Sequence, residues 1–453
     1  MIYDLVITGG IVITDDGPKQ QQIAIKNEKI QRLASNNQKF QALEYYRAEG
    51  CYIFPGGIDV HVHMEDLGID DVEDWPHGSY ASVSGGVTTV VDMPIDCVPS
   101  TVNAENVRKK LCRIQGRAYT DYLLWGGLSN KNLNEIPGML QEGVVGLKSF
   151  LVECGIEDYP MTTDAILEKA LKIAAKKKFP IMIHAESEQL NKKNTAIYAG
   201  SKNYRDWTYM HSIEGETEAV NRCIYYAKKT NARIHIAHVS NGQTLDMIRK
   251  AKQEKVKITC ETCPHYLYFT EDDYERKGAY LKCAPPIRSA KEQECLWEGI
   301  EDGTIDMVSS DHSPSLYQEK GPYVKDAWAG ISGLQQTLLI LYGEGYGKRG
   351  ITLPTIAKVF ASNAAKLLGI NEQKGCVEVG KDADLTILDP GKDTLFNEKN
   401  IETKRKESVY LGEEMEGRVT ATFLRGHRVY KGNPEGVYIR RRQKIFDSKE
   451  EIM

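Results

Sequence analysis

The sequence lacks several features that would assign the chain to other classes of protein. None of its apolar runs is long enough to span a bilayer. Its formal net charge of −5 gives no basic excess for binding nucleic acid or an acidic membrane surface. The first residues have neither the basic start nor the long apolar stretch of a signal peptide. We therefore expect a cytoplasmic protein with neither a nucleic-acid nor a membrane partner.

The sequence also lacks the cysteine spacing of a disulfide framework. Its ten cysteines are scattered, so reduced thiols are expected. The single Cys-x-x-Cys, Cys260 to Cys263, has no second pair and lies in a strand-like apolar stretch. A redox or zinc function is possible for such a pair, but two thiols buried in a strand are the favoured interpretation.

The apolar pattern divides the 453 residues into two kinds of structure. Residues 1–54 contain short strand-like runs separated by turns, and the same pattern of short runs and turns is found after residue 370. We predict one small β-sandwich domain built from both termini, residues 1–54 together with 371–453. Residues 55–370 instead alternate apolar strands with amphipathic helices, which indicates a parallel sheet buried on both faces.

Eight strands are predicted in this central region, at residues 57–63, 87–94, 119–128, 144–151, 180–186, 232–240, 256–264 and 305–313. Eight strands joined by helical connections predict an α/β fold of the (β/α)₈ TIM-barrel type. In such barrels the catalytic groups lie at the carboxyl ends of the strands.

Side chains able to bind metal occur at five of the eight strand ends. His61 and His63 are two residues apart in one strand, so their imidazoles leave it on the same side. The further candidates are Lys148, His184, His238 and Asp311. Any one of them alone is usually structural, but a barrel gathers its strand ends into one pocket. The set therefore predicts a site for two borderline cations such as zinc.

Lys148 has two interpretations at this point. It lies inside an apolar run, where an ammonium group must be paired, neutralised or modified. The side chain either reaches the polar rim of the pocket or reacts as a neutral amine with carbon dioxide. The resulting carbamate would bridge two metal ions.

Several motifs along the chain, two of which contain Lys148 and Asp311, resemble the amidohydrolase superfamily, in its branch of cyclic amidohydrolases. The motifs are FPGGID at 54–59, GGVTT at 85–89, GLK at 146–148, ETCPHY at 261–266, APPIR at 284–288, SDHS at 310–313 and GKDAD at 380–384. The resemblance covers nearly the whole chain. It implies that His61, His63 and Asp311 hold one metal ion, that His184 and His238 hold the other, and that carboxylated Lys148 bridges them. Asp311 would also take a proton from the attacking hydroxide and pass it to the leaving nitrogen.

Within the branch, the sequence most resembles the allantoinases. The stretches that carry this resemblance are KSF at 148–150, KCAPP at 282–286 and GISGLQ at 330–335. Dihydroorotases carry an arginine where this chain has Glu65, and dihydropyrimidinases and hydantoinases carry a tyrosine where it has Glu153. The two glutamates either face the pocket and bind ureido or amino groups, or form salt bridges with lysines at the rim. The resemblance further implies that backbone groups at Ala284 and Ala329 hold the ring amides.

The expected activity is hydrolysis of a cyclic amide in a small ureide or hydantoin-type ring. The expected substrate is allantoin, and the expected product is allantoate. The resemblance also implies two metal ions per chain, a function in purine metabolism and a homotetramer. A hydantoinase or dihydropyrimidinase with another ring as substrate is the alternative, and a dihydroorotase is less favoured. The complete set of six ligands argues against a non-catalytic scaffold of this fold, and Lys148 argues against a single-metal deaminase.

Overall fold

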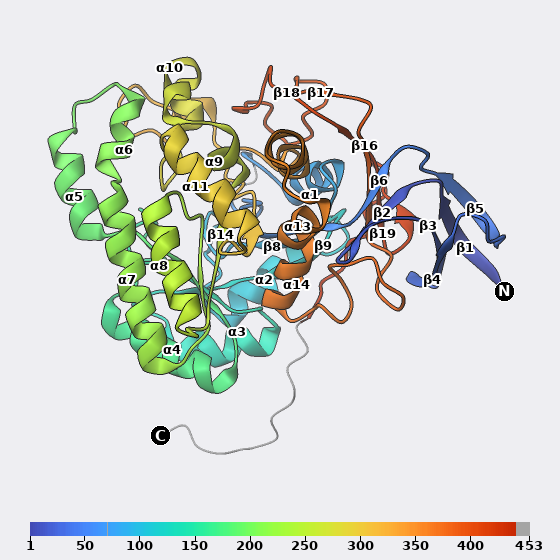
Figure 1. The fold of residues 1–453 in the computed structure, drawn as a ribbon. Coiled ribbons are helices and arrows are strands. Elements are labelled where there is room, and N and C mark those ends of the chain that lie inside the picture. Colours follow the sequence, from blue (N-terminus) through green and yellow to red (C-terminus); the bar gives the residue numbers. More distant parts are fainter. Residues whose placement is uncertain (70, 441–453) are drawn as a thin grey trace.

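The computed structural model describes residues 1–69 and 71–440. Parallel strands surrounded by helices form one region, and a nine-stranded sheet adjoins it at one side (Figure 1). None of the helices in these two ranges combines the length and the apolar character needed to cross a membrane.

Each of the eight predicted barrel strands contains an observed strand. The strands are β7 (Gly57–Val62), β8 (Val87–Asp92), β9 (Asp121–Leu124), β10 (Gly126–Leu128), β11 (Leu147–Phe150), β12 (Ile181–His184), β13 (Ile234–Ile236), β14 (Ile258–Thr262) and β15 (Met307–Val308). Neighbouring strands pair in parallel, and their side chains are buried on both faces, as the apolar runs predicted. The predicted parallel α/β architecture is confirmed.

The third predicted strand is interrupted at Trp125, which separates β9 from β10. β9 pairs with β8, and β10 pairs with β11. The Trp125 indole nitrogen donates to the carbonyl oxygen of Val60 at 2.9 Å, so the side chain crosses to β7. At the other edge, Val62 of β7 forms a parallel bridge with His312, beyond β15. The strands therefore follow one another around a ring, with their carboxyl ends on one rim.

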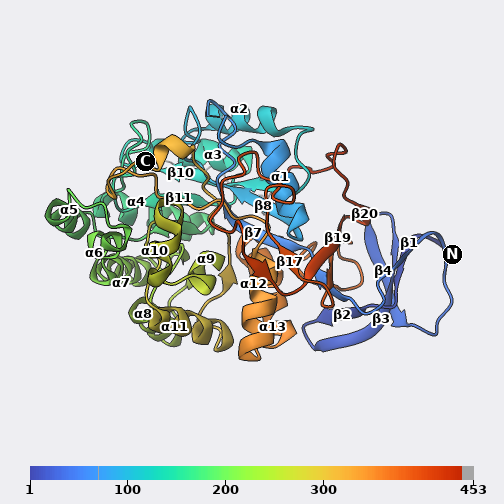
Figure 2. The ribbon, with the colours of Figure 1, turned by 90° about the horizontal axis from the view of Figure 1, so that it is seen from above.

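Helices lie outside the strands (Figures 1 and 2). They are α1 (Trp75–Ser84), α2 (Ala104–Ile114), α3 (Ile136–Glu142), α4 (Asp164–Lys177), α5 (Glu188–Ile197), α6 (Trp207–Met210), α7 (Ile213–Thr230), α8 (Gly242–Gln253), α9 (Pro264–Tyr268), α10 (Tyr274–Lys277), α11 (Ala290–Glu301), α12 (Thr337–Ile340), α13 (Leu353–Ala357) and α14 (Asn363–Leu368). In α7, the buried Ala219, Cys223 and Ala227 recur every four residues, the spacing of one helical face. That face packs on the barrel core.

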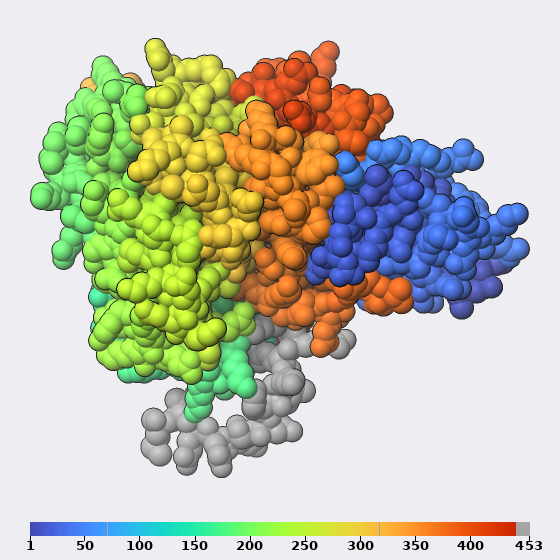
Figure 3. Space-filling view, in the orientation of Figure 1, coloured from blue at the N-terminus to red at the C-terminus, as the bar shows by residue number. Residues whose placement is uncertain are grey.

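The nine-stranded sheet combines both ends of the chain. Its strands are β1 (Ile2–Thr8), β2 (Ile11–Thr14), β3 (Gly17–Lys26), β4 (Lys29–Ser35), β5 (Gln41–Arg47), β6 (Tyr52–Pro55), β16 (Leu385–Asp389), β19 (Arg418–Leu424) and β20 (His427–Arg428). β6 pairs with β2 on one side and with β16 on the other. Apolar residues from both ends share one core, among them Ile7, Ile23 and Phe423. In Figure 3 the blue N-terminal strands form a lobe beside the orange segment, where α13 packs against β2 and β3.

Parts of the C-terminal stretch also contact the barrel. The short strands β17 (Thr394–Leu395) and β18 (Glu414–Met415) pair with each other, and Tyr410 between them belongs to the barrel's core cluster. Further on, Ile439 N donates to Tyr122 O at 2.9 Å beside β9. The domain boundaries at residues 54 and 370 stay a prediction, and residues 441–453 of the predicted sandwich lie outside the described ranges.

A buried charge cluster joins the sheet to the barrel. The Lys374 ammonium is 2% exposed and lies 2.8 Å from Asp121 Oδ2, 3.0 Å from Asp382 Oδ2 and 2.5 Å from Asp384 Oδ2. Asp121 begins β9 of the barrel, and Asp384 directly precedes β16 of the sheet. The lysine therefore neutralises carboxylates from both regions at their contact.

Candidate metal centre and active-site pocket

The six predicted metal ligands converge on one cavity of about 700 Å³ at the carboxyl rim of the barrel. His61, His63, Lys148, His184, His238 and Asp311 all line it. Two of them, His238 and Asp311, lie just beyond short strands with φ of +36° and +47°. Positive φ is uncommon for residues other than glycine and clusters at functional sites.

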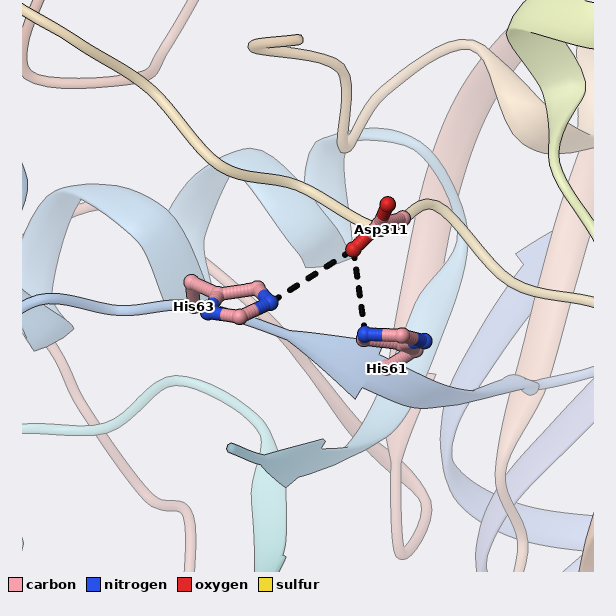
Figure 4. Close-up of side chains that lie close together, drawn as sticks. All are labelled: His61, His63 and Asp311. Atoms are coloured by element: carbon pink, nitrogen blue, oxygen red, sulfur yellow. Dashed lines mark ion pairs between the residues drawn. The ribbon is translucent and has the colours of Figure 1, made fainter. Parts of the chain in front are cut away.

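His61, His63 and Asp311 form the first group of ligand atoms (Figure 4). Asp311 Oδ1 lies 3.0 Å from His61 Nε2 and 3.5 Å from His63 Nε2. One ligand atom from each residue lies within 4.8 Å of the other two. Burial raises the pKa of Asp311, but the imidazoles of His61, His63 and His238 outweigh it and hold that pKa well below its ordinary value. Two imidazole nitrogens and a carboxylate are a donor set that suits a divalent cation.

Lys148 and the other two histidines lie beside this group. The ring centroid of His238 is 5.5 Å from that of His61 and 4.5 Å from that of His184. Lys148 Nζ lies 3.3 Å from His61 Nε2. Its side chain is fully buried, 0% exposed, and burial lowers its pKa to about 8. The fourth strand therefore presents an amine with weakened basicity to the cavity.

Three of the histidines are held from behind by carboxylates. Glu261 Oε1 lies 2.5 Å from His61 Nδ1, and Asp96 Oδ2 lies 2.7 Å from His63 Nδ1. On the other side of the centre, Glu186 Oε2 lies 2.7 Å from His184 Nε2. These contacts leave one ring nitrogen of each histidine for the cavity, which is the arrangement found around metal-ligating histidines.

Sequence reasoning missed these three carboxylates. Asp96 follows β8, Glu186 follows β12 and Glu261 lies within β14. Because a histidine that binds metal usually donates its other N–H to a carboxylate or carbonyl, acidic residues near the rim of the barrel were the available signal.

The model of the amidohydrolase family matches residues 52–429.

The chain belongs to the amidohydrolase family.

Curated relatives include the allantoinase of Deinococcus radiodurans, 35% identical over 98% of this chain and 100% of the relative. The allantoinase of Rubrobacter xylanophilus is 34% identical over 97% of this chain and 98% of the relative. Among solved structures, the L-hydantoinase (dihydropyrimidinase) of Arthrobacter aurescens superposes with a TM-score of 0.91, at 31% identity over 97% of this chain and 98% of that one. A D-hydantoinase superposes at 0.90 with 28% identity, over 97% of this chain and 99% of that one. The predicted family and fold are confirmed, and the chain is a cyclic amidohydrolase.

The predicted substrate-binding residues of this amidohydrolase take different positions. Ala284, Ala329 and Glu153 line the cavity. Glu153 is exposed at the rim, where its Oε2 accepts from Met161 N at 3.3 Å. Neither Glu153 nor Glu65 forms an ion pair with a lysine among the described residues.

Glu65 is 3% exposed and is not among the residues that line the cavity. Burial, together with the charges of Asp96 and Glu73, holds the pKa of Glu65 well above its ordinary value. Its backbone has φ of +53°. The next residue, Asp66, pairs at 2.7 Å with Arg117, which follows the end of α2. The chain therefore turns away from the cavity directly after His63, which spacing along a strand did not predict.

Part of the cavity wall has no counterpart among the predicted site residues. It includes the side chains of Trp207, His211, Lys282 and Trp328. Trp328 lies in the long connection between β15 and α12, and its backbone N donates to Glu319 O at 2.8 Å. This connection forms part of the wall, so loop residues contribute to the cavity as much as strand ends do.

Proposed function

We propose that this amidohydrolase is a binuclear, metal-dependent allantoinase that opens the cyclic amide of allantoin to give allantoate. The observation that carries the proposal is the convergence of six ligand-type side chains from five strand ends on one cavity. The similarity to allantoinases over nearly the full length of the chain supports the choice of ring.

His61, His63 and Asp311 would hold one cation, and His184 and His238 would hold the second. Lys148 would bridge them as a carbamate formed with carbon dioxide. Its complete burial and its lowered pKa of about 8 support this assignment, because a neutral amine is the form that reacts. When bound, two divalent cations such as Zn²⁺ would activate a water molecule and polarise the amide carbonyl.

The chain's own residues supply the proton transfer and the binding of the ring. Asp311 is placed between His61 and His63 and would accept the proton of the attacking water and donate it to the leaving ring nitrogen. Backbone groups at Ala284 and Ala329, both on the cavity wall, would hold the ring amides. A cytoplasmic location, a role in purine metabolism and a homotetramer belong to the same proposal.

The alternative is a hydantoinase or dihydropyrimidinase that acts on a different ring. The high structural similarity to two hydantoinases favours it. Against it, this chain has Glu153 in the lining, a position where the resemblance implies a tyrosine in those enzymes.

A substrate panel distinguishes the two. Zinc-loaded protein would be assayed with allantoin, hydantoin, dihydrouracil and dihydroorotate, before and after removal of the metal with a chelator. The proposal predicts the highest kcat/KM with allantoin, its loss with the chelator and its return with zinc. A higher kcat/KM with dihydrouracil or hydantoin would replace the allantoinase assignment with the alternative.

A further inference from the structure

One wall of the cavity continues outward from the ligand histidines as a connected row of side chains. Glu186 contacts His184 Nε2 through Oε2 and His211 Nδ1 through Oε1, both at 2.7 Å. The His211 ring centroid lies 3.9 Å from that of Trp207, and Lys282 Nζ lies 3.8 Å from the Trp207 centroid. All five residues line the cavity. The row therefore leads from the candidate metal centre to Lys282.

Two members of this row keep bonding capacity that the described protein does not use. Glu186 Oε1 contacts Nδ1 of His211 and also accepts from Asn191 Nδ2 at 3.3 Å, so Nε2 is the ring nitrogen left for a ligand. Lys282 is 1% exposed and donates to the carbonyl oxygen of Ala327. Across residues 1–69 and 71–440, Lys282 has no carboxylate partner within ion-pairing distance. Burial, with Lys320 nearby, lowers its pKa to about 7.

The chemistry of the wall favours a neutral, planar arm with both donors and acceptors. The lining also contains the carboxylates of Glu153 and Glu186, which would repel an anionic arm. With Nδ1–H donated to Glu186, His211 Nε2 accepts a hydrogen bond, and Lys282 donates one. The indole of Trp207 lies between them and contacts both side chains. A ureido group carries a carbonyl oxygen and N–H donors on one planar frame, so it matches both the acceptor and the donor.

We propose that Trp207, His211 and Lys282 form an arm subsite, which binds the ureido arm of allantoin and distinguishes it from unsubstituted hydantoin. The inference rests on the proposed function and deepens it. The hydantoin ring lies at the metal centre, the arm extends along the row, Lys282 donates to its carbonyl oxygen and His211 Nε2 accepts from its N–H.

The test compares two rings in two variants of the zinc-loaded enzyme. His211→Phe keeps a ring against Trp207 and removes the acceptor, and Lys282→Met keeps the length of the side chain and removes the donor. Each should lower the ratio of kcat/KM for allantoin to that for hydantoin about tenfold, the size of one lost hydrogen bond. The loss should appear mainly as a higher KM for allantoin, because the ureido arm itself is unchanged by the reaction.

Lys320→Met is the matched control. Lys320 is another lysine of low basicity, with its pKa lowered to about 8 by burial. Its Nζ donates to Trp328 O at 3.1 Å and to Gly330 O at 2.9 Å, in the connection between β15 and α12 that also contains Ala327. Lys320 does not line the cavity. The ratio of the two kcat/KM values should stay at the wild-type value in this variant. An equal fall in the ratio in Lys320→Met would show that Lys282 only holds the connection between β15 and α12 in place. That result would overturn the arm subsite.

The remaining outcomes separate the subsite from the function. Allantoin hydrolysis by the wild type, with an unchanged ratio in both variants, would reject the subsite alone. A metal-loaded wild type that does not hydrolyse allantoin would reject the function itself. If the enzyme does not hydrolyse hydantoin, the affinity for hydantoin is measured as its inhibition constant in the allantoin assay, and this constant is compared with the KM for allantoin. If Lys282→Met does not fold, judged by circular dichroism, Lys282→Gln replaces it with the same expected fall.

Discussion

At the scale of single residues, the candidate metal centre depends on partners that fix its ligands. Glu261 Oε1 lies 2.5 Å from His61 Nδ1, so the Nε2 of that ring faces Asp311 and Lys148. The lysine itself has no such carboxylate partner among the described residues and is enclosed by Phe150, whose ring centroid is 5.0 Å from Nζ. Burial therefore controls the charge state of the lysine, because it lowers the pKa to about 8.

Replacement of this lysine tests the bridge. Lys148→Ala should lose both metal ions and allantoin hydrolysis, because the carbamate would contribute a ligand to each ion. Metal content per chain and turnover measure the two effects. Short carboxylic acids added to the variant should restore part of both, and full activity in the variant without them would contradict the bridge.

Replacement of the carboxylate separates chemistry from metal binding. Asp311→Asn should keep most of the metal, since an amide oxygen can still coordinate, but should lose proton transfer. General acid–base groups contribute roughly 10²–10⁴-fold, so kcat should fall by at least about 10²-fold. Near-normal turnover by the metal-loaded variant would exclude Asp311 from the mechanism.

At the scale of elements, close approach between neighbouring strands positions the lysine. Gly146 directly precedes β11, which carries Lys148, and a Cβ at this glycine would lie 2.3 Å from the carbonyl oxygen of Pro180, directly before β12. That oxygen is backbone and cannot rotate away. Only glycine therefore lets the two strands approach at this point.

Gly146→Ala should destabilise the protein by about 1–3 kcal/mol, the usual cost of an overpacked core, and should lower the bound metal. Thermal unfolding and metal analysis measure the two effects. Gly200→Ala is the control, because a Cβ there meets no atom within 4 Å. Equal changes in both variants would show that the contact with Pro180 is unimportant.

The strands and their ligands could be predicted because both are local patterns. Apolar runs mark buried strands, and residues two apart share a face, which placed His61 and His63 together. The break at Trp125 depends on a hydrogen bond to Val60, 65 residues away in sequence. The course of the chain after His63 depends on Arg117 binding Asp66. Contacts between distant segments decided these features, so no local pattern could indicate them.

The arm subsite was beyond prediction for the same reason. His211 is at the end of α6, and Lys282 follows a short helical turn, so neither belongs to a barrel strand. The fold brings them together through Trp207, whose indole nitrogen donates to Cys283 O at 2.7 Å.

At the scale of the whole molecule, the barrel and the nine-stranded sheet share the buried charges around Lys374. Removal of one partner of a buried ion pair commonly costs about 3–5 kcal/mol, because the other charges stay buried. Lys374→Met should therefore lower the unfolding temperature markedly. Lys392→Met removes a lysine that is 58% exposed and pairs with Asp389 at 2.8 Å, and it should leave the unfolding temperature nearly unchanged, because exposed ion pairs contribute little. Similar unfolding temperatures for both variants would contradict a joining role for Lys374.

The most direct test of the proposed function is the mass of the product formed from allantoin in heavy-oxygen water. Zinc-loaded enzyme should give allantoate with one heavy oxygen atom in its new carboxylate, since hydrolysis adds solvent oxygen to the carbonyl carbon. A chelator should stop product formation, and zinc should restore it. Allantoin left unchanged by the metal-loaded enzyme, or product formed equally fast after the metal is removed, would contradict a metal-dependent allantoinase.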